Sequence, residues 1–171
     1  MLKELASRLI IKRAEYKDIH IIEDILNDAI CWMNINKIPN LWSHENVSWN
    51  NLSKSYDIDD FYIAYITEQP VGCMAITDED KMYWKKDKVG EALYLHKLAV
   101  KQNFRGIGVS SELINYAKQI TISSGVKLLK LDCNAERLKL RKIYQSNGFK
   151  LVDIIYMDNN YKMALYVMDV T

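Results

Sequence analysis

The segment that most constrains the fold runs from residue 92 to residue 133. It begins with the apolar run ALYLHKLAV (92–100), which is typical of a strand covered on both faces. The glycine-containing loop KQNFRGIG follows, and apolar side chains then recur at helical spacing from Val109 to Ile120. Gly125 is a natural stop for that helix, and LLKLDC (128–133) reads as the next strand. A long crossover helix between two strands implies a parallel pair, so the segment predicts a βαβ unit.

The rest of the chain supplies further strands and helices around this unit. Asp18 is a plausible N-cap for a helix that presents Ile22, Leu26 and Met33 on one face. Residues 61–77 predict a β-hairpin that turns at Glu68-Gln69-Pro70, with Gly72 tolerating a bend or bulge. Further expected elements are a first strand at 8–14, a short helix and loop within 34–56, a helix at 135–146, and strands at 151–157 and 162–169. The order predicts a mixed sheet.

Composition limits the class of protein. A chain of 171 residues is expected to form a single domain, 1–171, and a net charge of +1 gives no reason to expect a nucleic-acid or membrane partner. No apolar run approaches the ~18 residues of a membrane helix, and charges interrupt the N-terminal segment, so no secretory signal is expected. Three cysteines without CxxC spacing fit a reducing cytoplasm, and three scattered histidines predict no metal site.

The glycine loop lies where a strand gives way to a helix. Backbone N–H groups and the positive end of the helix dipole meet there, and glycine allows close approach, so the loop suits an anion such as a phosphate. A tight turn without a ligand is the alternative. No lysine follows Gly108 as a P-loop requires, and Ser111 weakens a match to the dinucleotide fingerprint.

Two segments carry a resemblance to a known family. LHKLAVKQNFRGIGVSSELI resembles the acyl-CoA-binding segment of GCN5-related N-acetyltransferases, whose pattern [QR]xxGx[GA] is met by Arg105, Gly108 and, with serine in the last place, Ser110. RLKLRKIYQSNGF resembles the family's second segment, NxxAxxxYxxxGF, with matches at Tyr144, Gly148 and Phe149. The upstream order of strand, helix pair and hairpin also agrees, so the resemblance covers nearly the whole chain.

The resemblance implies a fold and an activity. The fold would be α/β (α+β), with a mixed, mostly antiparallel central sheet, a splayed parallel strand pair and helices on both faces. The activity would be transfer of an acetyl group from acetyl-CoA to a primary amine, by direct attack in a ternary complex. The acceptor would be a small molecule or a peptide, and a homodimer is compatible with the family.

The same resemblance assigns residues to the coenzyme. The pantetheine arm would pair with the edge of the strand that precedes the loop, and the pyrophosphate would sit on the loop amides. Arg137 stands where the family has an asparagine that contacts the coenzyme, and Asn134 is the candidate substitute. The expected coenzyme-binding residues are Leu98, Ala99, Val100, Arg105, Gly106, Ile107, Gly108, Val109, Ser110 and Asn134.

The chemistry needs a base and an acid. His96 is the candidate general base, since a neutral imidazole is available at physiological pH, although a histidine satisfied within the sheet is an equal alternative. Glu91 and Asp132 are the other candidates for the base. Tyr144 matches the family's usual acid for the departing thiolate. Trp32 and Trp42 are the expected acceptor-binding residues, with packing as the alternative for Trp32. Cys133, at a strand end, is interpreted as a structural residue rather than a nucleophile.

Two other classes remain open at the level of sequence. One is a non-catalytic acyl-CoA-binding or regulatory module, in which Arg137 marks a lost coenzyme geometry. The other is a nucleotide-binding α/β domain that uses the loop for a different phosphate. A metabolite, an antibiotic, a protein N-terminus and a lysine side chain are all acceptors that the enzyme reading allows.

Overall fold

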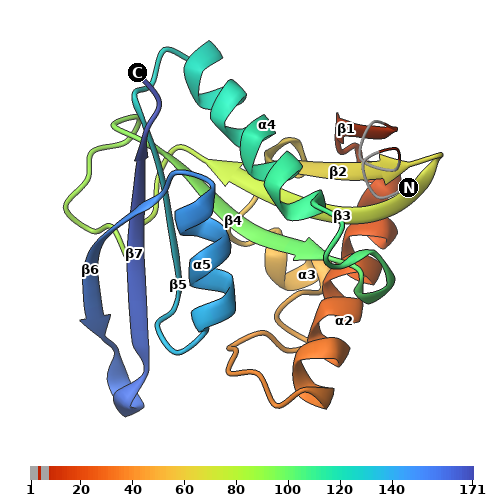
Figure 1. Ribbon diagram of the computed structural model, residues 1–171, viewed down its shortest axis with the longest axis horizontal. Helices are drawn as coiled ribbons and strands as arrows, with labels where there is room; N and C mark the ends of the chain where they lie inside the picture. Colours follow the sequence, from red (N-terminus) through yellow and green to blue (C-terminus); the bar gives the residue numbers. More distant parts are fainter. Residues whose placement is uncertain (1–3, 5–7) are drawn as a thin grey trace. The chain divides into compact units, whose positions relative to one another are not determined.

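The structure of the protein is a computed structural model that describes residues 4 and 8–171 (Figure 1). Its strands follow the order β1-β2-β3-β4-β5-β7-β6, in which β4 and β5 pair in parallel and the other described ladders are antiparallel. This mixed, mostly antiparallel sheet with one parallel pair confirms the expected fold class. None of the described helices is long and apolar enough to cross a membrane.

The strands are β1 Leu9–Arg13, β2 Phe61–Ile66, β3 Gln69–Thr77, β4 Leu93–Val100, β5 Leu128–Asn134, β6 Lys150–Tyr156 and β7 Lys162–Asp169. The helices are α2 Ile19–Ile35, α3 Trp49–Leu52, α4 Val109–Ser123 and α5 Leu138–Ser146.

The described chain divides into two compact units. The first comprises Met1–Ala75 and Lys97–Leu113, and the second comprises Ile76–His96 and Ile114–Thr171. The division runs through β4, so that one strand contributes residues to both units.

In the first unit, helix α2 supplies much of the core. Its buried residues are Ile22, Ile25, Leu26, Ala29, Ile30 and Met33, which confirms the predicted apolar face. Asp18 is the N-cap residue as expected, but its carboxylate accepts a hydrogen bond from the N–H of Glu15 rather than from the helix. The buried face of α2 belongs to one cluster with Val47, Leu52 and Phe61, so the segment between α2 and β2 packs over the same core.

The β2–β3 hairpin turns earlier than the sequence predicts. Thr67 and Glu68 have φ values of 48° and 66°, so two successive residues adopt the left-handed region that matches the twist of a two-residue hairpin. Gln69 and Pro70 already belong to β3, and Pro70 lies opposite Tyr65. The expected turn at Glu68-Gln69-Pro70 was therefore wrong, because the backbone of Thr67-Glu68 makes the reversal before proline is reached.

Gly72 adjoins a register shift of the β2–β3 ladder between Ala64 and Tyr65, which agrees with the expected bulge, and it also permits a close approach. A Cβ atom at this position would lie 2.8 Å from the carbonyl oxygen of Ala99 and 3.2 Å from Cγ1 of Val109. Both neighbours belong to the segment that carries the glycine loop. The absence of a side chain at Gly72 thus lets β3 support the end of β4 and the start of α4.

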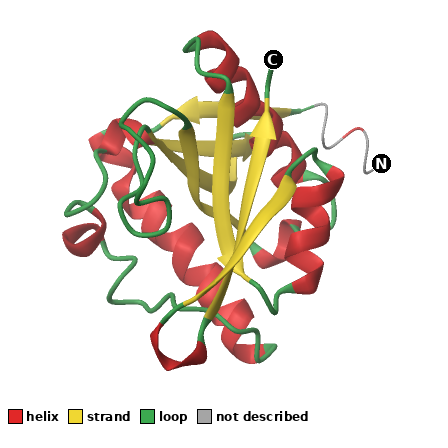
Figure 2. Cartoon of the chain, turned by 90° about the vertical axis from the view of Figure 1, so that its left-hand side faces the viewer, coloured by secondary structure: helices red, strands yellow, loops and turns green. Residues whose placement is uncertain are grey.

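The second unit contains the start of β4, most of α4, all of β5 and the last two strands. Figure 2 shows the helices and strands of the chain by type. The parallel ladder of this unit pairs Leu93 with Leu129 and Tyr94 with Lys130, a short register that fits the expected splaying of this strand pair. Helix α5 starts three residues later than the predicted Ala135. The N–H of Ala135 still bonds to Lys162 in the sheet, and the Asn134 Oδ1 accepts from the N–H of Glu136, so a turn takes the place of the first helical residues.

A buried ion pair anchors the loop 78–91 to this unit. The Asp87 Oδ2 accepts hydrogen bonds from Lys130 Nζ and from the Tyr94 hydroxyl, each at 2.6 Å. Lys130 is 7% exposed, and its ammonium lies 4.6 Å from the ring centroid of Trp84. On this loop, Asp87 therefore neutralises the buried ammonium of Lys130, and the ring of Trp84 covers it.

Removing Asp87 should destabilise the fold strongly. We expect Asp87→Ala to lower the free energy of unfolding in urea by about 3–5 kcal/mol, because Lys130 is left buried without a counter-charge. The matched control is Lys81→Ala in the same loop, whose pair with Glu79 involves side chains that are 83% and 41% exposed and should contribute less than about 1 kcal/mol. Equal effects of the two variants would contradict the role assigned to Asp87.

Candidate functional site

The glycine loop in the first unit has the backbone geometry of an anion site. Gly106 and Gly108 have φ values of 78° and 97°, which side-chain-bearing residues adopt only under strain, and a Cβ at either position would meet nothing within 4 Å. The bond from the N–H of Glu112 to the Gly108 carbonyl opens α4, so the N–H groups of Val109 and Ser110 are not used by the helix itself. Open space in front of a helix start fits a pyrophosphate.

The strand before the loop has an irregular backbone in its middle. Lys97 has a φ of 52°, and His96, Lys97 and Leu98 are half-buried, between buried residues at both ends of β4. Ala99 and Val100 are buried, whereas Leu98 is half-buried. The N–H of Lys101 then bonds to the Val71 carbonyl at 2.9 Å, which fixes the end of the strand to β3 within the same unit.

Both tryptophans expected to bind the acceptor lie against basic side chains. The guanidinium carbon of Arg105 is 3.4 Å from the ring centroid of Trp32, and the Lys97 ammonium is 5.1 Å from that of Trp42. Trp32 is therefore brought to the predicted coenzyme loop, which the sequence did not indicate. Acceptor binding by Trp32 and Trp42 stays a prediction.

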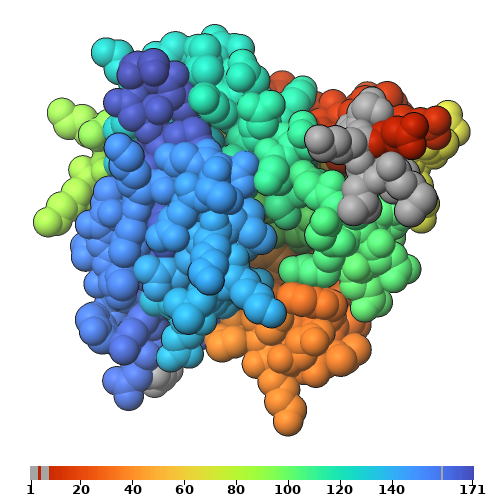
Figure 3. All heavy atoms as spheres, viewed as in Figure 1, coloured from red at the N-terminus to blue at the C-terminus, as the bar shows by residue number. Residues whose placement is uncertain are grey.

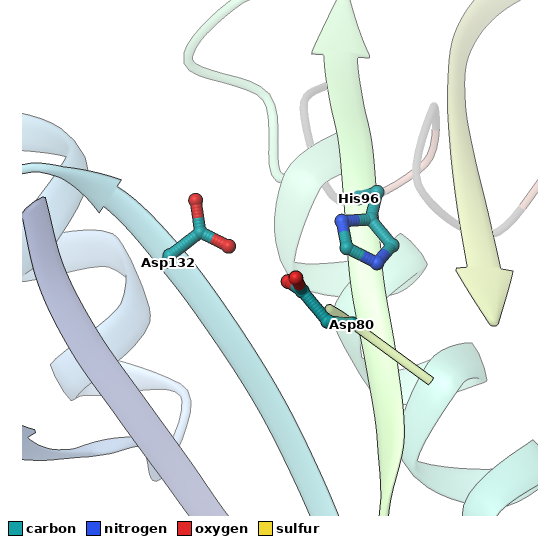
Figure 4. Close-up of side chains that lie close together, drawn as sticks. All are labelled: Asp80, His96 and Asp132. Atoms are coloured by element: carbon teal, nitrogen blue, oxygen red, sulfur yellow. The ribbon is translucent and has the colours of Figure 1, made fainter. Parts of the chain in front are cut away.

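In the second unit, three polar side chains from distant parts of the chain converge. Asp80 belongs to the loop after β3, His96 to β4 and Asp132 to β5. One ligand-type atom from each lies within 4.8 Å of those of the other two, and Figure 4 shows the carboxylates and the ring turned toward one another. Two carboxylates and an imidazole can hold a cation, whether an ammonium or a divalent metal ion.

The hydrogen bonds of Thr77 define which nitrogen of His96 carries the proton. The Thr77 hydroxyl donates to the Glu79 carbonyl at 2.9 Å, and that carbonyl can only accept. Toward His96, 3.0 Å away, the hydroxyl oxygen must then accept, so Nε2 is the protonated nitrogen of the neutral ring. Figure 4 shows the other ring nitrogen, Nδ1, on the side of Asp132. Such a histidine is oriented for proton transfer.

Tyr83 completes the surroundings of this cluster. Burial raises the pKa of its hydroxyl to about 12, and the negative charges of Asp132 and Asp80 act in the same direction. The phenol therefore stays protonated at neutral pH and can donate a hydrogen bond. The two carboxylates that affect Tyr83 are those that converge on His96.

Tyr144 and Asn134 also lie in the second unit. Tyr144, on α5, is 6% exposed, and its ring contacts those of Phe149 and Tyr166 at 5.9 and 6.0 Å. Burial raises the pKa of the Tyr144 hydroxyl far above its usual value, so the group is a poor full proton donor and acts best through a hydrogen bond. Asn134 is buried at the end of β5, and Arg137 is the N-cap residue of α5.

The cysteines lack the features of a nucleophile. Burial, with the charge of Asp132 acting in the same sense, raises the pKa of the Cys133 thiol to about 12, so the reactive thiolate is scarce at neutral pH. Cys73 is likewise buried with a pKa of about 12, and Cys31 is exposed. All three are free thiols. The structural interpretation of Cys133 agrees with this environment.

Sequence reasoning missed the surroundings of His96. Thr77 ends β3, and Asp80 and Tyr83 follow it in a charged stretch, TDEDKMYW, that reads as an ordinary solvated loop. The one local signal is Asp80, whose Oδ1 accepts from the N–H groups of Met82 and Tyr83, as an aspartate that starts a turn commonly does. Its distance in sequence from Asp132 concealed their proximity.

A family model and a curated relative that match this chain are both described as acetyltransferases. A family model described as "Acetyltransferase (GNAT) family" matches residues 26–149. An uncharacterized N-acetyltransferase of Bacillus subtilis (strain 168), YesJ, is 23% identical over 61% of this chain, and the match spans 65% of the length of that relative.

Solved structures with the same fold are numerous. A GNAT-family acetyltransferase from Listeria monocytogenes 4b F2365 superposes with a TM-score of 0.70 at 19% identity, covering 94% of each chain. A chain of the NatC complex, solved with a Gag peptide and CoA bound, gives a TM-score of 0.68 at 15% identity over 96% of this chain and 99% of its own. At these identities the likeness concerns the fold.

The proton position on His96 is open to direct measurement. In ¹⁵N-labelled protein, two-bond ¹H–¹⁵N spectra above the titration of the ring should show Nε2 as the protonated nitrogen of His96. Thr77→Val removes the accepting oxygen and should reduce the population of that tautomer, while the exposed His20 serves as the internal control. A protonated Nδ1 in the native protein would refute the assignment.

Proposed function

The chain belongs to the acetyltransferase (GNAT) family, and from this premise we propose that it is an N-acetyltransferase that moves an acetyl group from acetyl-CoA to a primary amine. The observation that carries the proposal is the glycine loop, with its left-handed Gly106 and Gly108, at the start of α4 within the matched region. Attack by the amine on the thioester is direct, in a ternary complex.

The donor site is proposed on the first unit. The pyrophosphate lies on the backbone between Arg105 and Ser110, where N–H groups and the helix dipole favour negative charge. The pantetheine arm pairs with the edge of β4 at Leu98–Val100, and Asn134 is a further proposed contact. The CoA bound in the NatC structure, a neighbour of the same fold, supports this choice of donor.

His96 is the proposed general base. An alkyl amine with a pKa of ~10.4 costs about 4.6 kcal/mol to hold neutral at pH 7, so a base beside it is valuable. The carboxylates of Asp80 and Asp132 receive the incoming ammonium, and His96 takes one proton from it before the attack, so that a neutral amine with a free lone pair reaches the thioester. The second proton, which the nitrogen loses as the amide forms, passes to solvent. We propose that no metal ion takes part and that the cluster instead binds the positive charge of the acceptor.

The departing sulfur requires a partner as well. An N–H at the Leu98 end of β4 would stabilise the developing oxyanion, as a preorganised backbone donor can. A phenol is a weaker acid than a thiol by roughly 2 kcal/mol at their ordinary pKa values, and burial widens the gap for Tyr144. Tyr144 therefore donates a hydrogen bond to the thiolate, and solvent supplies the proton.

The proposal also covers the domain, the acceptor, the assembly and the location of the enzyme. We assign both units to one acetyltransferase domain, 1–171, with a small-molecule or peptide amine as acceptor and a homodimer as the assembly. The three free thiols support a reducing, cytoplasmic location. The alternative is a non-catalytic acyl-CoA-binding module, which the position of Arg137 favours, and such a module would bind acetyl-CoA without releasing CoA in the presence of any amine.

Calorimetry tests the donor site. The native protein should bind acetyl-CoA and show no heat with ATP or NAD, and Gly108→Asp should abolish binding, since it adds negative charge at a residue with a φ of 97°. Circular dichroism checks that the variant is folded. Failure of the native protein to bind acetyl-CoA would remove the proposed function, whereas binding without CoA release across an amine panel would favour the module.

Tyr144→Phe separates chemistry from binding. Loss of the hydroxyl should lower kcat by about 10–10³-fold, with little change in acetyl-CoA affinity. Because the pKa of Tyr144 is raised, its hydroxyl stays protonated through pH 10, so its ionisation should cause no alkaline fall of native kcat below that pH. CoA release, assayed with EDTA present, gives kcat, and calorimetry gives the affinity. An unchanged kcat would exclude Tyr144 from the reaction.

A further inference from the structure

Three side chains on one face of α2 contact the segment that leads into the coenzyme loop. Asp24, Asp28 and Trp32 are spaced four residues apart, so they form a single row along the helix. Their partners are Lys101, the N–H of Gln102 and Arg105, which follow one another along the segment after β4. Figures 1 and 3 show the segment lying alongside the helix.

Each contact in the row is specific. Asp24 forms an ion pair with Lys101 Nζ, and the Asp28 Oδ2 accepts from the N–H of Gln102 at 2.7 Å. The Arg105 guanidinium lies over the face of Trp32, with its carbon 3.4 Å from the ring centroid, and Arg105 Nη1 donates to the Val100 carbonyl at 3.4 Å. The row thus fixes the backbone of the segment at Gln102 and the side chain of Arg105 three residues later.

The stack on Trp32 leaves the chemistry of Arg105 intact. A guanidinium stacks through its flat face, whereas its N–H donors point outward in the plane of the group. An exposed arginine otherwise explores many rotamers, and ordering it on binding an anion costs about 0.5–1.5 kcal/mol. An aromatic face that holds the guanidinium in place removes part of that cost before the anion arrives.

We infer that Trp32 is a positioning residue for donor binding: it holds the Arg105 guanidinium where it meets the coenzyme pyrophosphate. The inference rests on the proposed function, because it takes the glycine loop as the pyrophosphate site. It gives Trp32 a role with the donor in place of the predicted role with the acceptor.

A double-mutant cycle measured by acetyl-CoA calorimetry tests this inference. Trp32→Leu should weaken binding about 5–20-fold, the range of a partly exposed cation–π contact, and Trp32→Phe, which keeps an aromatic face, should restore most of the affinity. Arg105→Ala should weaken binding at least as much. In the Arg105→Ala background, Trp32→Leu should cause no further loss, because its only route to the ligand has been removed.

Controls separate positioning from a general effect on the fold. Trp49→Leu replaces another half-buried tryptophan of the same unit, one that packs edge-on to Phe61 6.1 Å away, and it should leave acetyl-CoA affinity unchanged. Dephospho-CoA keeps the pyrophosphate but lacks the 3′-phosphate, so Trp32→Leu should weaken its binding by the same factor. Thermal melts of every variant report any loss of stability.

Each outcome decides the matter. If the losses from Trp32→Leu and Arg105→Ala are additive, if Phe fails to rescue, or if native-like affinity persists in Trp32→Leu, the inference is wrong. A loss seen with acetyl-CoA but not with dephospho-CoA would assign Arg105 to the 3′-phosphate and overturn it as well. The proposed function survives all of these results; it fails if the native protein does not bind acetyl-CoA, or if it binds acetyl-CoA but releases no CoA with any amine.

Discussion

The buried ammonium of Lys130 is the charge on which the second unit depends. Lys130 sits within β5, opposite Tyr94 on one side and Val167 on the other, where the sheet offers no solvent. Asp87 supplies the counter-charge, and its bond to Lys130 holds the loop that begins at Asp78 against the sheet. The bond from the Gly90 N–H to the Asp78 carbonyl closes this loop. Asp80 lies in the same loop, so one segment carries both the counter-charge of Lys130 and a carboxylate that lies near His96.

Helix α2 has a comparable organising role in the first unit. One row of its side chains holds the segment after β4, as described above. The neighbouring row, Glu23 and Asn27, holds the segment between α2 and β2, through the N–H of Trp49 and the ring of His44. The same helix thus supports the proposed donor loop and the segment that carries Trp42, a residue expected to bind the acceptor, while its apolar face remains in the core.

Local patterns explain what the sequence could predict. The buried face of α2, the βαβ segment and the glycine loop each depend on residues close together in the chain, and all are present in the structure. Two local predictions were wrong. The helix expected from Ala135 begins later, because the N–H of Ala135 bonds to Lys162 in the sheet. The hairpin turns before Pro70, because Thr67 and Glu68 adopt the left-handed region. The surroundings of His96 and the stack of Arg105 on Trp32 join residues far apart in sequence, and no periodicity encodes such contacts.

The burial of two of the three cysteines has a practical consequence. Cys73 and Cys133 are inaccessible and hold their protons tightly, whereas Cys31 is exposed on α2, one residue before Trp32. A thiol-reactive fluorophore would therefore attach at a single position of the unmodified chain. Such a dye would sit on the helix that holds the loop, where its emission can report ligand occupancy optically without any engineered labelling site.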